Sequence, residues 1–211
     1  MNITIIGAGN MGSALLKQLT RAGHKVHLTA RDSSKVNALA AAHPGAIATS
    51  PKDALADSSV VIVATGYADA VPALRALGSL EGKVVVDITN PLSADFMSLT
   101  IGHATSAADE IAKAVPGAEV VKAFNTLFAQ VLADGPAFEG GQTAPVFVAS
   151  DSERAKETVK ALVASIGFKP VDAGGLKNAR YLEPLAGLNI YLGYGAGYGT
   201  AIAPTWIRKA A

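Results

Sequence analysis

Short apolar runs alternate along the chain with longer segments whose apolar residues recur at helical spacing. Residues 59–65 and 83–87 are nearly continuous apolar runs, whereas residues 13–19 and 152–166 carry apolar residues every three or four positions. Continuous runs are typical of parallel strands covered by helices on both faces, and the spaced pattern predicts amphipathic helices. The chain is therefore predicted to have an α/β fold built on a doubly wound, mainly parallel sheet.

The same pattern gives approximate bounds for the other elements. Further strands are expected at residues 2–6, 25–29, 46–49, 119–123, 145–149 and 169–172, the last of which would close the sheet region. Further helices are expected to begin at residues 50–55, to span residues 68–77, and to begin near Leu176 or Lys177. Residues 135–143 form the expected mobile loop.

A glycine-rich turn joins the first strand to the first helix. Gly7 would permit the tight turn, Gly9 would let the backbone approach a phosphate, and Gly12 would let the helix pack closely on the strand. The N–H groups and the dipole at the start of the helix would attract the anion. A strand at residues 25–29 completes a βαβ unit, so the motif predicts a Rossmann-type dinucleotide site rather than a turn that serves packing alone.

The end of the second strand indicates which dinucleotide is bound. An NAD site normally has Asp or Glu there, about 20 residues beyond the glycines, whereas this chain has Ala30 followed by Arg31. Arg31 could hold a 2′-phosphate with its guanidinium group, and Lys35 lies one helical turn further on. The site is therefore predicted to bind NADP(H). Asp32 would be the ribose acid only in a shifted register, and its preferred role is the N-cap of the next helix.

Composition narrows the class of protein. Of the 211 residues, 50% are hydrophobic and 17% are charged, against roughly 25% charged in ordinary soluble domains. More surface than usual is therefore expected to be buried against a ligand or another subunit. A net charge of +1 argues against binding to nucleic acid or to an anionic membrane. The lack of cysteine excludes disulfides, thiolate catalysis and cysteine-type zinc sites, and no metal site is expected.

Two segments bear on the location of the protein. No targeting segment is visible, because a structural strand follows Met1 at once. Residues 185–207 carry no charge and are long enough to cross a membrane, but their glycines and Pro204 favour a buried helix and a glycine-rich turn. The expected location is the cytoplasm, with no membrane partner.

Ligands of open parallel sheets bind at the carboxyl ends of the strands, and here these ends carry small and amide residues. They comprise residues 65–67, 88–92 and 124–127. Asp87 could act as a base, but it is more readily the acceptor for backbone N–H groups of the next turn. None of the histidines lies at these ends, and each is expected to be a surface or half-buried side chain: His24, His27, His43 and His103. No catalytic side chain is therefore expected, which favours hydride transfer between two redox rings.

The later motifs resemble those of one enzyme family over nearly the whole length. Besides the glycine turn, they are residues 120–126 (VVKAFNT), 172–180 (DAGGLKNAR) and 188–190 (LNI). With them the chain resembles the NADPH-dependent deazaflavin-coenzyme reductases, or deazaflavin-dependent NADP oxidoreductases, and the related flavin-reducing domain of metalloreductases. No linker or repeat divides the chain, so we expect a Rossmann domain at residues 1–172 with a small helical cap at residues 173–211. In this family such a cap helps to cover the second redox ring.

The resemblance implies roles for individual residues. The phosphates would be held, beside Gly7, Gly12 and Ala30, by Gly9, Asn10, Met11, Arg31 and Lys35. The nicotinamide half would be lined by Thr65, Gly66, Asn90, Pro91 and Ala129. Asn125 would lie near the ring of the partner cofactor; deazaflavin-using members are expected to have His there and Pro in place of Phe128, so Asn125 matches the flavin-reducing relatives better. The implied acceptor is a deazaflavin coenzyme or a flavin, FAD or FMN.

These features lead to one preferred function and two alternatives. The preferred function is an NADP(H)-dependent oxidoreductase that transfers hydride between NADPH and a deazaflavin or flavin. The first alternative is an NADP-dependent reductase of a small imine, ketone or hydroxy acid, although little chain follows Asp172 for the usual helical substrate domain. The second is a non-catalytic NADP(H) sensor. The uncharged aromatic tail predicts a homodimer that buries part of it, rather than a tail folded back on its own sheet: Tyr191, Tyr194, Tyr198 and Trp206.

Overall fold

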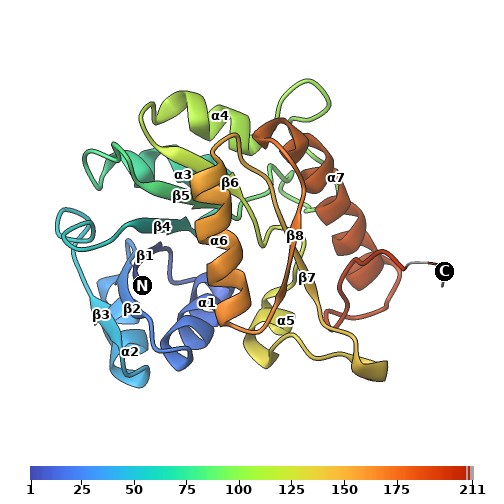
Figure 1. Cartoon of the computed structure of the whole chain (residues 1–211), viewed down its shortest axis with the longest axis horizontal. Coiled ribbons are helices and arrows are strands. Elements are labelled where there is room, and N and C mark those ends of the chain that lie inside the picture. The colour runs from blue at the N-terminus through green and yellow to red at the C-terminus, as the bar shows by residue number, and fades with distance from the viewer. Residues whose placement is uncertain (208, 210–211) are drawn as a thin grey trace.

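The computed structural model describes residues 1–207 and 209. Its centre is a six-stranded parallel sheet with the order β3-β2-β1-β4-β5-β6 (Figure 1). The strands are β1 Asn2–Ile6, β2 Lys25–Thr29, β3 Ala46–Ala48, β4 Val60–Val63, β5 Val84–Asp87 and β6 Glu119–Lys122. The strand order reverses between β1 and β4, which is the point at which doubly wound sheets bind their ligands.

Helices connect the strands, and three of them begin at a capping side chain. They are α1 Asn10–Arg21, α2 Ser33–Ala42, α3 Tyr67–Arg75, α4 Ala107–Ala114, α5 Ala129–Asp134, α6 Glu153–Ser165 and α7 Ala179–Ile190. Short 3-10 turns occupy Glu139–Gly141 and Leu176–Asn178. The side chains of Asp32, Ser106 and Ser152 accept backbone N–H groups in the first turns of α2, α4 and α6, which satisfies donors that helix ends leave free.

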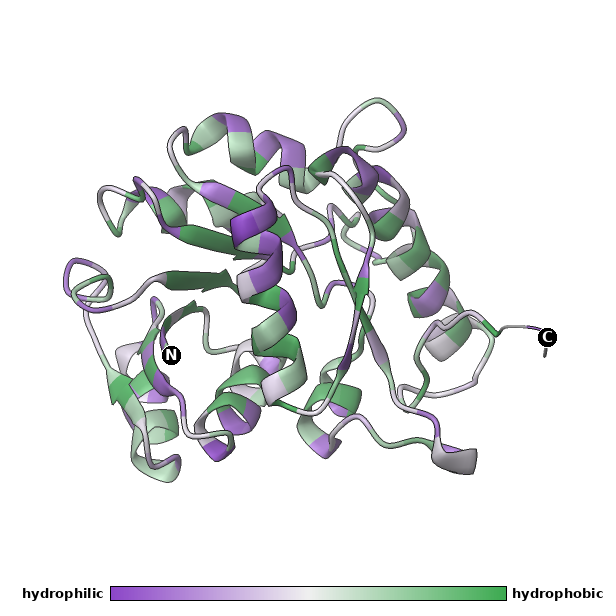
Figure 2. Ribbon diagram, viewed as in Figure 1, coloured by the Kyte–Doolittle hydropathy of each residue, from purple (hydrophilic) through white to green (hydrophobic). Residues whose placement is uncertain are grey.

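Two hydrophobic cores cover the two faces of the sheet. The first joins the sheet to α1, α5 and α6 and includes Ile5, Leu15 and Leu162. The second joins the opposite face to α3 and α4 and includes Ile6 and Leu74. Successive strand residues point to opposite faces, so Ile5 and Ile6 enter different cores. Figure 2 shows β4 in the hydrophobic colour along its length and α6 as alternating, and the predicted doubly wound α/β fold is confirmed.

The last two strands correct the sequence prediction. β7 Pro145–Val148 and β8 Lys169–Asp172 form a separate two-stranded parallel sheet beside α6. The bridge to the main sheet is antiparallel and joins Lys122 to Ala149, with N···O distances of 2.8 and 3.0 Å. The prediction that residues 169–172 close the main sheet is therefore wrong. Pro170 has no N–H group, which limits how far β8 can extend a hydrogen-bonded ladder.

A second correction concerns the segment after β3. The helix expected to begin at residues 50–55 is replaced by successive turns, in which Asp53 N–H donates to Ser50 O at 3.2 Å and Ala54 N–H donates to Pro51 O at 3.4 Å. Ala54 is buried but its neighbours at positions 50–53 are exposed, so the segment lacks the apolar face that stabilises a short helix. The short helices α4 and α5 were missed for the opposite reason, because tertiary packing stabilises them.

The C-terminal part of the chain leaves the sheet through α7. A π-helical turn at Tyr191–Gly195 continues the helix, and the following residues run along its side of the molecule at the right of Figure 1. In the part of the chain that the structure describes, no helix combines the length and apolar character needed to cross a membrane.

Candidate functional site

The glycine turn after β1 has a backbone that only glycine accommodates at two positions. Gly7 adopts a φ of +113°, and its N–H donates to the carbonyl oxygen of Thr29 at 2.8 Å. A Cβ atom at Gly7 would lie 2.4 Å from Ala64 O, and one at Gly12 would lie 2.0 Å from Gly7 O. Both glycines therefore allow the close approach of strand, turn and helix that the sequence motif predicts.

Gly9 has a different environment, because its backbone faces open space. A Cβ atom there would meet nothing within 4 Å. Gly9 is also the N-cap of α1 and, because it has no side chain, it makes no capping hydrogen bond to the N–H groups of the first turn. The N–H groups of the first turn thus remain free for a ligand at the positive end of a 12-residue helix.

The turn opens into a cavity of about 650 Å³ at the point where the strand order reverses. Pro72, Ala73 and Leu77 of α3 and its C-terminal continuation give the cavity an apolar lining suited to a flat base. The cavity brings together half of the predicted site residues: Gly7, Gly9, Ala30, Arg31, Lys35, Thr65 and Gly66.

Charged groups lie at the β2 end of this cavity. The Arg31 side chain is 90% exposed, and its Nη2 lies 3.1 Å from Asp69 Oδ2. The Asp32 carboxylate accepts hydrogen bonds from Ser34 Oγ at 2.6 Å and from Lys35 N–H at 3.1 Å, and these bonds lower the pKa of Asp32. The predicted N-cap role of Asp32 is confirmed, and Arg31 is left as an exposed cation for an anionic ligand.

Two asparagines at the ends of β5 and β6 hold each other. Asn90 Nδ2 donates to the backbone oxygen of Asn125 at 2.9 Å, and Asn125 Nδ2 donates to Asn90 Oδ1 at 3.0 Å. Asn125 Nδ2 also lies 3.0 Å from Leu182 O of α7. Asn125 Oδ1 is buried and has no hydrogen-bond partner among the described residues. This pair presents one free acceptor near the carboxyl ends of the two strands.

The remaining predicted residues are more dispersed. Asn10 and Ala129 line a second cavity of about 450 Å³, together with Phe128 and Tyr194. The Tyr194 ring packs edge-on against Phe128, with 5.6 Å between ring centroids, so the C-terminal segment forms part of the wall. Among the predicted residues, five line neither of these cavities: Met11, Gly12, Asn90, Pro91 and Asn125.

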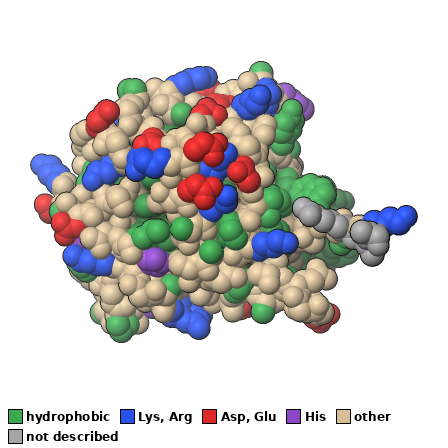
Figure 3. Space-filling model, in the orientation of Figure 1, with side chains coloured by type: hydrophobic (Ala, Val, Ile, Leu, Met, Phe, Trp, Pro, Cys, Tyr) green, Lys and Arg blue, Asp and Glu red, His purple; other side chains and the backbone are tan. Residues whose placement is uncertain are grey.

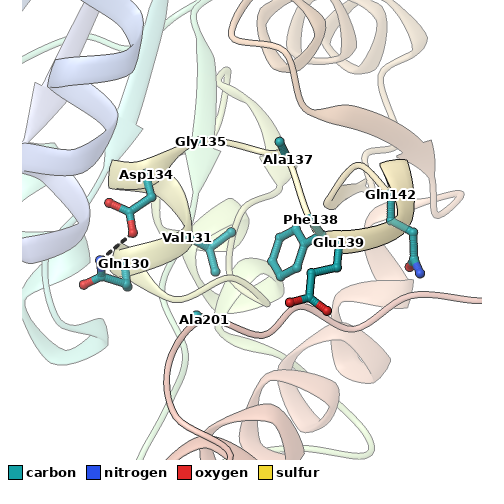
Figure 4. A pocket seen from close by; sticks show the side chains of 9 residues that line it. All are labelled: Gln130, Val131, Asp134, Gly135, Ala137, Phe138, Glu139, Gln142 and Ala201. Carbon is teal, nitrogen blue, oxygen red and sulfur yellow. Dashed lines mark hydrogen bonds between the residues drawn. The ribbon is translucent and has the colours of Figure 1, made fainter.

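A third cavity, of about 470 Å³, contains none of the predicted residues (Figure 4). It lies between α5, the segment around the 3-10 turn Glu139–Gly141, and Ala201 of the C-terminal segment. Figure 4 shows Asp134 turned toward Gln130, whose Nε2 donates to Asp134 Oδ2 at 2.6 Å. The carboxylates of Asp134 and Glu139 would repel an anion, so this cavity is unsuited to a phosphate.

A buried cluster of charges, which was not predicted from the sequence, lies behind the strand ends. Lys122 Nζ lies 2.8 Å from Asp87 Oδ2 and 2.8 Å from Glu183 Oε1, and Asp87 Oδ1 accepts the Thr89 N–H at 2.8 Å. The preferred role of Asp87 as a backbone acceptor is confirmed. A lysine in the otherwise apolar end of β6 was the available signal, because a buried cation needs a paired anion.

Tyr67, the first residue of α3, was also missed as a titratable group near the site. Its ring is half-buried, and burial raises the pKa of its hydroxyl, as do the nearby carboxylates of Glu110, Glu183 and Asp87. The hydroxyl therefore stays protonated at neutral pH and could donate a proton or hydrogen bond rather than act as a base.

Two histidines are more deeply buried than the sequence predicts. His24 and His27 are buried rather than surface or half-buried, whereas His43 is half-buried and His103 exposed, as expected. His24 bridges the amino group of Met1, 2.9 Å from Nδ1, and Ser165 Oγ, 2.8 Å from Nε2. His27 lies on β2, both of whose faces are covered, and its ring nitrogens have no hydrogen-bond partner among the described residues.

Comparison with known proteins gives several relatives. The profile of the family described as NADP oxidoreductase, coenzyme F420-dependent, matches residues 2–91. The crystal structure of a putative F420-dependent NADP-reductase from an Arthrobacter species is 30% identical, covers 98% of this chain and 99% of its own, and has a TM-score of 0.87. The F420-dependent NADP reductase of Methanothermobacter marburgensis is 29% identical over 91% of this chain and 92% of its own length.

A metalloreductase relative is matched along part of its length. Metalloreductase STEAP3 of Rattus norvegicus is 30% identical over 87% of this chain, and the chain spans 36% of the length of that relative. The fold and these relatives together define the NADP-dependent oxidoreductase class with a Rossmann-like sheet. Within that class, the chain belongs to the family of coenzyme F420-dependent NADP oxidoreductases, which confirms the resemblance found in its motifs.

Proposed function

We propose that the protein transfers hydride between NADP(H) and a deazaflavin or flavin coenzyme. The observation that carries the proposal is the cavity at the glycine turn, which combines an uncapped helix start with Arg31 and Lys35 and has Ala30 in place of a ribose acid. Relatives matched along almost their whole length are named for both NADP and coenzyme F420. The preference for NADPH, the nature of the acceptor and the roles of the residues below are all parts of this proposal.

The backbone around Gly9 fits a pyrophosphate, because it is open on one side and presents free N–H groups. We assign the phosphates to Gly9, Asn10 and Met11, with Gly7 and Gly12 shaping the turn. The 2′-phosphate would lie against Arg31 and Lys35 beside Ala30. When the phosphate binds, Arg31 would give up its exposed ion pair with Asp69 and form a charge-assisted hydrogen bond to the phosphate instead.

The ring half of the site is assigned to the strand ends. Thr65, Gly66, Asn90, Pro91 and Ala129 would line the nicotinamide, and bound NADPH would supply the hydride from its reduced ring. An unpaired buried acceptor costs roughly 1–3 kcal/mol, so the free Asn125 Oδ1 favours a partner from outside the protein. We propose that it accepts an N–H group of a bound coenzyme ring.

Hydride transfer between two rings depends mainly on how the rings are oriented toward each other, and less on a side chain that moves a proton. The reciprocal bonds between Asn90 and Asn125 fix both amides, which suits them to hold a ring at one angle. Asp87 is already occupied by Lys122 and the Thr89 N–H, and is not free to act as a base. The proposed mechanism therefore uses no catalytic side chain.

The division into residues 1–172 and a cap at 173–211 belongs to the proposal, as does a homodimer. Tyr191, Tyr194 and Tyr198 are each more than half exposed, and Figure 3 shows hydrophobic side chains gathered at the right of the molecule, where the C-terminal segment lies. Trp206 packs edge-on against Phe147 at 5.2 Å, so the segment also contacts its own body. A cytoplasmic location rests on the lack of cysteine.

The proposal is tested by turnover with defined acceptors. Purified protein is mixed with NADPH or NADH and, in separate reactions, with a deazaflavin coenzyme, FAD or FMN, while the absorbance of the reduced nicotinamide is followed. We expect oxidation of NADPH, and little of NADH, with at least one acceptor. Reduction of a cyclic imine or ketone without any flavin turnover would overturn the proposal in favour of a small-molecule reductase, and binding without any turnover would indicate a sensor.

A further inference from the structure

The buried charges behind the strand ends join three elements at one point. Lys122 of β6, Asp87 of β5 and Glu183 of α7 are each at most 1% exposed, and each contact to Lys122 Nζ is 2.8 Å long. Glu183 also accepts the N–H groups of Ala107 at 3.0 Å and Ala108 at 3.3 Å, where α4 begins. Moving one partner away would leave a buried unpaired charge, which is costly. The cluster therefore holds β5, β6, α7 and the start of α4 in one arrangement.

The cluster also holds the backbone that leads into the proposed site. Asp87 Oδ1 accepts the Thr89 N–H at 2.8 Å, and Lys122 Nζ donates to the Thr89 carbonyl oxygen at 2.5 Å. Both backbone polar groups of Thr89 are thereby fixed, and Asn90 is the next residue. The direction of the Asn90 side chain consequently depends on two bonds made by Asp87 and Lys122.

A second layer of hydrogen bonds lies beside the charges. Asn125 Nδ2 bridges Asn90 Oδ1 and the carbonyl oxygen of Leu182, and Leu182 directly precedes Glu183 in α7. The two layers therefore link the same three elements, β5, β6 and α7, through adjacent residues. A shift of Lys122 would move Asn90 and Asn125 together, and with them the free Asn125 Oδ1.

We propose that Lys122 is a positioning residue for the coenzyme ring, acting through Thr89 on the Asn90–Asn125 pair. The inference rests on the proposed function in one respect, that this pair faces the nicotinamide half of NADP(H). If the cluster only stabilised the fold, its loss would weaken binding to both halves of the nucleotide site alike.

Two variants separate the contact from the charge. The cluster contains two carboxylates and one ammonium, with a formal charge of minus one. Lys122→Met/Glu183→Gln keeps that charge on Asp87 but removes the contact to Thr89. The matched control Glu183→Gln keeps Lys122 on Thr89 while changing the formal charge to zero. If the double variant does not fold, Lys122→Gln/Glu183→Gln replaces it, because the shorter amide loses the same contact.

The first readout is binding of two nucleotides by the full chain. NADPH carries the ring, whereas 2′,5′-ADP carries only the adenosine half and its 2′-phosphate. In the double variant we expect NADPH to bind about 10-fold more weakly, as misplacement of a ring-holding group implies, with 2′,5′-ADP unchanged. The control should bind both nearly as the parent does. Equal losses for the two nucleotides, or no loss for either, would overturn the proposal.

The second readout is independent of the coenzyme. Hydrogen exchange at the Asn125 side-chain amide, which donates to Asn90 Oδ1 and to Leu182 O, is measured by NMR in the ligand-free protein. Faster exchange in the double variant, but not in the control, is expected, and unchanged exchange would contradict the positioning role. If the parent protein turns over no acceptor, the proposed function fails, while this measurement still decides the role of Lys122.

Discussion

Arg31 is the residue that most directly tests the choice of nucleotide. Its guanidinium is exposed at the cavity and bound only to Asp69 among the described charged groups. Replacing Arg31 with Ala should weaken NADPH by about 2 kcal/mol, or roughly 30-fold, as expected for a charge-assisted bond to phosphate. NADH, which lacks the 2′-phosphate, should bind almost unchanged. Titration of both nucleotides by fluorescence measures the two affinities.

Asp69 supplies the matched control for this variant. Asp69→Asn removes the competing carboxylate and leaves Arg31 free, so NADPH should bind slightly more tightly than to the parent. If Arg31→Ala weakens NADPH and NADH equally, the assignment of the 2′-phosphate to Arg31 is wrong.

Asn125 and Tyr67 test whether the mechanism relies on orientation alone. Asn125→Ala removes the amide that bridges Asn90 and Leu182, and the single-turnover hydride-transfer rate should fall about 10- to 100-fold through lost positioning. Tyr67→Phe removes a hydroxyl that is protonated at neutral pH and should leave the rate nearly unchanged. Loss of hydride transfer in Tyr67→Phe, or in any single His or Asp variant that still binds the nucleotide, would show that a proton donor or base is needed.

Single residues were predictable where local geometry determines their role. Gly7, Gly12 and Asp32 act on groups a few residues away or on the adjacent strand, so the turn and the cap could be identified from spacing. Lys122 and His27 could not be placed in the same way. Their partners and burial depend on how distant segments pack, with Glu183 lying 61 positions beyond Lys122.

At the scale of elements, His24 lies between α1 and β2, joins the amino group of Met1 to Ser165 of α6, and should make folding depend on pH. Burial, and secondarily the charged amino group of Met1, lower the pKa of His24. A histidine with a lowered pKa in the folded state contributes stability that is present above its unfolded pKa, about 6.5, and is lost as the pH falls below that value. Burial also lowers the pKa of His27, which affects stability in the same direction.

We therefore expect the free energy of unfolding to decrease between pH 7 and about pH 5. His24→Gln keeps a polar side chain but cannot gain the proton, so part of this decrease should disappear. Urea unfolding of the parent and the variant at several pH values measures the slope. His43→Gln, at a half-buried position on the end of α2, is the control and should keep the parental slope. A parental slope in both variants would exclude His24 as a contributor.

The strands of the main sheet could be predicted from short apolar stretches, which are clearest in β4 and β5, whose residues are all buried. β3 is a partly exposed strand at the edge of the sheet. The order of those strands was not predicted and comes from the structure. The separate sheet of β7 and β8 could not be predicted, because β7 has the same apolar appearance as a central strand. The helix predicted to begin at residues 50–55 does not form for a related reason. The Ser50 hydroxyl donates to the Asp53 carboxylate and caps no backbone N–H group of the described residues, and no apolar face follows it.

At the scale of the whole molecule, the C-terminal segment has one side against the body and another exposed. A Cβ atom at Gly193 would lie 2.6 Å from Phe128 Cζ, so the segment packs tightly at that point. Tyr198 and Trp206 are nevertheless both 69% exposed. Exposed aromatic groups in an uncharged stretch favour burial against another subunit or a ligand, which is the basis of the proposed dimer and cap.

A chain that ends after Gly193 tests both proposals at once. It loses Tyr194, Tyr198 and Trp206 but keeps the glycine turn and Arg31. We expect it to be monomeric or to aggregate in light scattering and to lose turnover with the acceptor. Binding of NADPH should persist in part, because the proposed phosphate contacts lie in the proposed domain of residues 1–172. A chain that ends at Ile207 retains the aromatic residues and should behave as the parent. If the chain ending at Gly193 stays dimeric and fully active, the segment is neither an interface nor a cover for the acceptor ring.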